Sequence, residues 1–63
     1  MDREIKKEIL DEFFVQWKFG KSPKMIASEL SGRASSNDIN ECRDVFEKWI
    51  KSKKPWSHVD KML

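Results

Sequence analysis

Residues 18–33 read KFGKSPKMIASELSGR, and this stretch decides the fold because it ends one helix and begins and ends another. Gly20 fits the position after a helix, where the backbone often needs a positive φ. Ser22 is a typical N-cap, and Pro23 suits the first helical position, where its missing N–H leaves nothing unsatisfied. Gly32 closes the helix that follows. We therefore predict a short helix that begins at Pro23, between two longer ones.

Upstream, residues 2–19 have the period of an amphipathic helix. Asp2 suits the N-cap, and Glu4 lies in the first turn, where the helix dipole favours a carboxylate. Apolar side chains recur three and four positions apart, which places them on one helix face. These predicted core residues are Ile5, Ile9, Leu10, Phe13, Phe14 and Trp17.

Downstream, a second long helix is expected to begin at Ser35 or Ser36, because Ser35 and Asp38 have the spacing of a capping box. Pro55 must end it at or before Lys54. The predicted apolar residues are Ile39, Cys42, Val45, Phe46, Trp49 and Ile50 in this helix, and Met25, Ile26, Ala27 and Leu30 in the short helix before it.

Composition excludes several classes of protein. The chain has 63 residues, 13 Lys and Arg, 11 Asp and Glu, and a formal net charge of +2, so it holds one domain at most. With one Cys and one His, it can form neither an internal disulfide nor a four-ligand zinc site, and we expect no metal and no cofactor. Cys42 lies on the apolar stripe and His58 has no neighbouring Cys, so we expect no catalytic residue and no enzyme. No stretch is apolar enough for a membrane span or a signal peptide, which favours a cytoplasmic protein.

These helix lengths and short connections predict an all-α, three-helix domain over residues 1–54, with a helix-turn-helix in its second half. Residues 55–63 are expected to form a C-terminal arm or short helix, capped by Ser57. The arm either folds back on its own core or covers another subunit. Because a chain this short has a marginal core, we predict a homodimer. The expected interface residues are Trp49, Trp56, Val59, Met62 and Leu63.

The stretch over residues 18–33 resembles the middle of a Myb/SANT repeat, with an aromatic-Gly pair, then Ile-Ala-x-x-Leu, then Gly-Arg. The segment from Cys42 to Trp49 is similar to the Cys-Arg-x-x-aromatic start of that family's third helix. The resemblance covers about residues 9–50 and implies a homeodomain-like fold. Three features depart from the pattern: a first Trp near the N-terminus is missing, extra residues precede Cys42, and the arm with Trp56 lies outside the repeat.

In length, helical pattern, Trp49 and C-terminal arm, the chain also resembles the C-terminal domain of the DNA-replication organiser proteins of phi29-like Bacillus phages. This resemblance implies a dimer that binds DNA without sequence preference and that works with other replication proteins. It further implies a coiled coil and a membrane anchor before this segment, which would place the domain at the cytoplasmic face of the membrane.

The charge is uneven along the chain. Residues 20–36 sum to +2 and residues 51–63 to +3, whereas residues 1–19 sum to −1 and residues 37–50 to −2. Cationic side chains release condensed counterions from nucleic acid, so these basic regions predict phosphate contacts, although lysines also occur on any solvated surface. The predicted residues that contact DNA, single- or double-stranded, are Lys18, Lys21, Lys24, Arg33, Lys48, Lys51, Lys53, Lys54 and Lys61.

Acidic residues on the second long helix oppose close entry into a DNA groove. Asp38, Glu41, Asp44 and Glu47 would meet phosphates there, which disfavours sequence-specific readout of bases. A protein–protein interaction module that uses this acidic face is the first alternative, and a sequence-specific transcription regulator is the second. Trp56, beside several lysines, also suits base stacking on a single strand.

Overall fold

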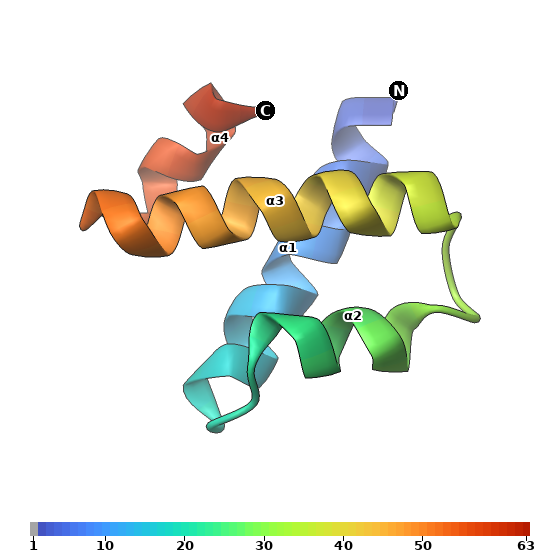
Figure 1. Ribbon diagram of the computed structural model, residues 1–63. Coiled ribbons are helices and arrows are strands. Elements are labelled where there is room, and N and C mark those ends of the chain that lie inside the picture. Colours follow the sequence, from blue (N-terminus) through green and yellow to red (C-terminus); the bar gives the residue numbers. More distant parts are fainter. Residues whose placement is uncertain (1) are drawn as a thin grey trace.

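The computed structural model describes residues 2–63, with side chains from residue 3 onward. All secondary structure in this range is helical, which confirms the all-α class. Figure 1 shows that α1 crosses behind α3, that α2 runs alongside α3 in the opposite direction, and that α4 lies across α3 from α2. The elements are α1 (Asp2–Lys18), α2 (Pro23–Leu30), α3 (Ser36–Ser52), the 3-10 turn η1 (Trp56–His58) and α4 (Val59–Met62).

The predicted helix boundaries around α2 and α3 are confirmed by their capping contacts. The Ser22 hydroxyl accepts a hydrogen bond from the Met25 amide at 3.3 Å. The Ser35 hydroxyl accepts one from the Asp38 amide at 3.2 Å. Gly20 has a φ of 97°, as expected after a helix. Each contact is local, so a short stretch of sequence determines each helix start or end.

Two other capping predictions have different outcomes. α1 begins at Asp2 itself, and the side chain of Asp2 lies outside the described ones, as does any cap that it makes. The predicted cap of the arm, Ser57, lies inside η1, and neither η1 nor α4 starts with a side-chain cap. That prediction is wrong because the fixed φ of Pro55 and the packing of Trp56 start the turn two residues earlier, with Pro55 in the N-cap position.

One core joins α1, α2, α3 and α4. Two predicted core residues are wrong: Ile5 is 48% exposed and Met25 is 53% exposed. Met25 lies in the first turn of α2, where helical side chains lean back past the start of the helix. At Ile5, the adjacent Lys6 is the residue that contacts α3, through Glu41 and Cys42. The buried residues are Ile9, Leu10, Phe13, Ile26, Ala27, Leu30, Ile39, Cys42, Phe46, Trp49 and Val59.

The C-terminal arm folds back on the core of its own chain. The Trp49 indole donates a hydrogen bond to the Pro55 carbonyl at 3.1 Å. The Trp56 ring stacks on Phe14, with centroids 4.3 Å apart and planes 18° apart. Of the five predicted interface residues, Trp49 and Val59 are buried inside the chain, and the other three are half-buried against the same core. The homodimer stays a prediction.

Candidate nucleic-acid interface

Two segments of the chain contain lysines but neither Asp nor Glu. They are residues 13–28, at the end of α1 and the start of α2, and residues 48–59, at the end of α3 and the following turn. A lysine in either segment therefore has no carboxylate within its own segment to neutralise its charge. The lysines are Lys18, Lys21 and Lys24 in the first segment, and Lys48, Lys51, Lys53 and Lys54 in the second.

Aromatic packing brings these two segments to the same end of the molecule. The Trp17 and Trp49 rings, one from each segment, meet edge to face with centroids 5.7 Å apart. Phe14 contacts Trp49 in the same way at 5.6 Å. In Figure 1, the end of α1 and the end of α3 both lie toward the left side of the molecule. We call the seven lysines of the two segments the basic end.

Few of these lysines have a carboxylate partner. Lys48 pairs with Asp44 at 3.4 Å, but both side chains are 69% exposed, and such surface pairs contribute little to stability. Lys18 lies over the Phe14 ring, with its ammonium 4.8 Å from the centroid. Within the described part of the chain, four exposed lysines of the basic end besides Lys18 have no ion pair, so their charge is available to an anion. They are Lys24, Lys51, Lys53 and Lys54.

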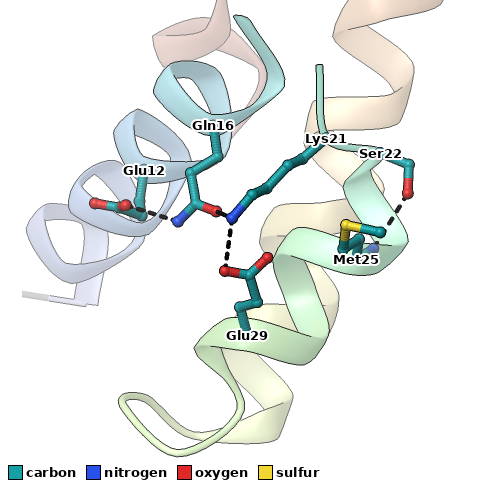
Figure 2. A network of polar contacts seen from close by, with 6 residues as sticks. All are labelled: Glu12, Gln16, Lys21, Ser22, Met25 and Glu29. Atoms are coloured by element: carbon teal, nitrogen blue, oxygen red, sulfur yellow. Dashed lines mark hydrogen bonds and ion pairs between the residues drawn. The ribbon is translucent and has the colours of Figure 1, made fainter. Parts of the chain in front are cut away.

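The corner between α1 and α2 is held by a polar network, which Figure 2 shows from close by. The Lys21 ammonium lies between the Gln16 amide oxygen, at 3.3 Å, and a Glu29 carboxylate oxygen, at 2.9 Å. The Gln16 amide nitrogen in turn donates to Glu12 at 2.8 Å. The Lys21 amide also donates to the Gln16 carbonyl at 3.2 Å, which closes the helix end. The backbone of this corner is therefore fixed by several contacts.

Lys53 has a left-handed backbone, with φ 58° and ψ 27°, directly after α3. Glycine is the residue that adopts this conformation without steric cost, and a lysine here costs about 1 kcal/mol. The chain therefore carries a cation at a position where glycine would give the more stable fold. Such local strain is common at functional positions.

The structure does not bring two of the predicted DNA-binding residues to the basic end. Arg33 lies in the turn after α2 and Lys24 near the start of that helix, so residues 25–30, about 9 Å of helix, and part of the turn separate the two. Lys61 lies on α4, in the arm. The separation of Arg33 from Lys24 follows from the length of α2, whereas the position of Lys61 depends on how the arm packs.

A groove of about 280 Å³ between α2 and α3 contains further polar residues that the sequence did not single out. Arg43 lies in this groove with Lys24, and its guanidinium is 3.8 Å from Glu47. Arg43 was missed because four acidic residues surround it in the sequence of α3. Its spacing from Ser36 and Asn40 places all three on one helix face, which is the signal that could have found it. The hydroxyl and amide residues of the groove are Ser28, Ser31, Ser36 and Asn40.

Cys42 has no nucleophilic character in this fold. Its side chain is buried, and its thiol donates to the Lys6 carbonyl at 3.4 Å. Burial, reinforced by the charges of Asp38 and Glu41, raises the pKa of Cys42 from 9.0 to about 11, so the thiol is protonated at neutral pH. Among the described residues, no group of three or more His, Cys, Asp and Glu is placed to hold a metal ion.

Comparison with protein-family models, with curated proteins and with solved structures found no match to this chain. In the described range, no helix combines the length and the apolar character that crossing a membrane requires. The function of the basic end is therefore inferred from its own charge and geometry.

Proposed function

We propose that this chain binds the phosphate backbone of nucleic acid, without sequence preference, through the basic end. One observation carries the proposal: two acid-free basic segments, distant in the sequence, meet at one end of the fold through the Trp17 and Trp49 rings. A polyanion that lies across this end would contact lysines from α1, α2 and α3 at once. Each such contact releases condensed counterions, which is the main source of affinity in non-specific binding.

The distribution of the ion pairs supports the same conclusion. Lys6 pairs with Glu41 at 2.7 Å, and Lys7 pairs with Asp60, so acidic residues neutralise the opposite half of α1. At the basic end, only Lys21 and Lys48 have a carboxylate partner among the described residues. The positive potential is thus concentrated at one end, although the chain has a net charge of only +2.

The proposal includes a homeodomain-like arrangement and a homodimer. Two basic ends in one dimer would raise the avidity for a long polyanion without any new type of contact. The acidic residues of α3, such as Asp44 and Glu47, keep this helix out of a DNA groove, so the lysines contact backbone rather than base edges. A role in DNA replication, as in the phage proteins that the sequence resembles, is compatible with this mode.

The test is a fluorescence-anisotropy titration of random-sequence DNA at several salt concentrations. Replacing both Lys51 and Lys54 with Ala should lower the slope of log K against log salt by about two, because each phosphate contact contributes about 0.9 on duplex DNA. The charge-matched control replaces both Arg33 and Lys61 with Ala, which removes the same charge away from the basic end. Its slope should stay near that of the wild type.

Three results would contradict the proposal. Equal loss in both double variants would show that contacts are spread over the whole surface. No binding at low salt would remove nucleic-acid binding and leave the protein-interaction module on the acidic face of α3. A large preference for one duplex would instead favour the transcription regulator.

A further inference from the structure

Phe19 is the most exposed large apolar side chain of the described residues, at 82%. It is the last residue before Gly20, at the corner between α1 and α2. Burying a phenylalanine stabilises a fold substantially, and a chain of this length has little core to spare. A phenylalanine that stays in solvent on such a chain does not stabilise the fold and is available to contact a partner.

The backbone holds Phe19 in a fixed position. Its own amide donates to the Gln16 carbonyl at 3.1 Å, and the next amide, of Gly20, donates to the Trp17 carbonyl at 2.9 Å. The Lys21 contacts with Gln16 and Glu29, shown in Figure 2, close the corner on the other side. The ring is therefore presented by a rigid turn and not by a loose loop, which lowers the entropy lost when it binds.

Cations adjoin this ring in the chain. Lys18 precedes Phe19, Lys21 follows it by two residues, and no acidic residue occurs between residues 13 and 28. Met25, 53% exposed, adds a second apolar side chain to the same corner. An exposed ring within a positive segment is complementary to a partner that has both flat apolar faces and negative charge.

The tryptophans do not offer a comparable surface. Trp56, which the sequence suggested for base stacking, is itself stacked on Phe14 at 4.3 Å. Trp49 is buried, and Trp17 packs edge to face against both Trp49 and Phe46. Among the described aromatic residues of residues 13–28 and 48–59, the two segments that contain the lysines of the basic end, Phe19 has the greatest exposure.

We infer that Phe19 is a stacking platform for unpaired bases, so that the preferred ligand of the basic end is single-stranded nucleic acid. This inference rests on the proposed function and deepens it. In a duplex, the faces of the bases are covered by their neighbours, and an aromatic side chain cannot stack on them without unstacking the helix. A single strand exposes these faces, and an aromatic ring stacks on any base, which requires no sequence preference.

The test compares an oligothymidylate of about 15 nucleotides, near the upper limit of single-strand site sizes, with a duplex of the same length. Phe19→Ala should weaken binding of the single strand about tenfold, the typical loss when one base-stacking ring is removed, and should leave duplex binding unchanged. The salt slope should not change, because no charge is removed. Since the side chain is exposed, the thermal midpoint of the variant should equal that of the wild type.

Two further variants separate ring stacking from general apolar contact. Phe19→Tyr keeps the ring and should bind the single strand like the wild type, whereas Phe19→Leu keeps apolar area and should bind like Phe19→Ala. Val15→Ala, a change at a side chain that is 49% exposed on α1, is the control for loss of exposed apolar surface and should have no effect.

Four results would overturn the inference. Full affinity of Phe19→Leu for the single strand would exclude stacking. Equal affinity of the wild type for both ligands, with no effect of Phe19→Ala, would remove the single-strand preference and leave the proposed backbone binding intact. No binding of either ligand would refute the proposed function itself. Sedimentation that shows a wild-type dimer and a Phe19→Ala monomer would assign this ring to a second copy of the chain.

Discussion

Replacing Trp56 with Ala tests how the C-terminal arm contributes to the fold. The Trp56 ring stacks on Phe14 at 4.3 Å and meets Trp49 edge to face at 4.9 Å and Phe46 at 5.8 Å. These contacts join the arm to α1 and α3. Without them, the arm would still be held by the buried Val59, by the hydrogen bond of the Pro55 carbonyl with the Trp49 indole, and by the contacts of Asp60 with Arg3 and Lys7.

The size of the effect follows from burial and ring contacts. Truncating a fully buried Trp to Ala costs about 3–5 kcal/mol, so a half-buried one costs about 2 kcal/mol. Loss of the aromatic pair with Phe14 adds about 0.5–1.5 kcal/mol. The expected loss is therefore about 2.5–3.5 kcal/mol, which is a large part of the roughly 3–9 kcal/mol typical of a chain of 63 residues. The thermal midpoint should fall by about 10–20 °C.

The assay is urea and thermal unfolding followed by circular dichroism, repeated over a wide range of protein concentration. Val15→Ala is the control, because this side chain is 49% exposed and outside the core cluster. A loss of stability below about 1 kcal/mol in Trp56→Ala would show that this ring does not hold the arm on the core. A wild-type midpoint that rises with concentration, and a Trp56→Ala midpoint that does not, would show that this ring also stabilises a subunit interface.

Two further predictions concern backbone and pH. Gly20→Ala should destabilise the chain by about 1–2 kcal/mol through the positive φ of this position alone, since an added Cβ meets nothing within 4 Å. Lys53→Gly should stabilise the chain by about 1 kcal/mol and weaken nucleic-acid binding. Unfolding and anisotropy titrations measure these effects, and a destabilising Lys53→Gly would contradict the strain argument. Because the pKa of Cys42 is raised from 9.0 to about 11 in the folded chain, its contribution to stability is fully present below pH 9 and is lost as pH rises toward 11. Urea midpoints across this range should fall more steeply for the wild type than for Cys42→Ala, in which lysine titration still occurs but the thiol is absent; parallel curves would exclude this linkage.

The helix limits were predictable because their signals are local. Ser22 with Pro23, Ser35 and Gly20 each act on atoms within a few residues, so the sequence alone indicates where these helices begin or end. Ile5 shows where periodicity fails, because it has the spacing of the predicted core stripe, yet its neighbour Lys6 faces α3 while Ile5 is 48% exposed. Periodicity predicts a direction around the helix axis and not the extent of the neighbouring surface.

The candidate site was predictable only in its charges. Sequence composition indicated the basic regions, but it could not show that Lys21 pairs with Glu29 or that Trp17 meets Trp49. Those facts depend on how the helices pack. Phe19 was missed for a related reason: its direction is determined by the turn at Gly20 and not by the helical period that precedes it.

The packing of all three tryptophans into one cluster has an optical consequence. Trp49 lies 5.7 Å from Trp17 and 4.9 Å from Trp56, centroid to centroid, so the three indoles absorb and emit as neighbours in a fixed, asymmetric arrangement. Near-ultraviolet circular dichroism arises from such fixed arrangements and disappears when tertiary packing is lost. The native chain therefore carries an unlabelled spectroscopic reporter at the junction of α1, α3 and the arm, directly behind the lysines of the basic end.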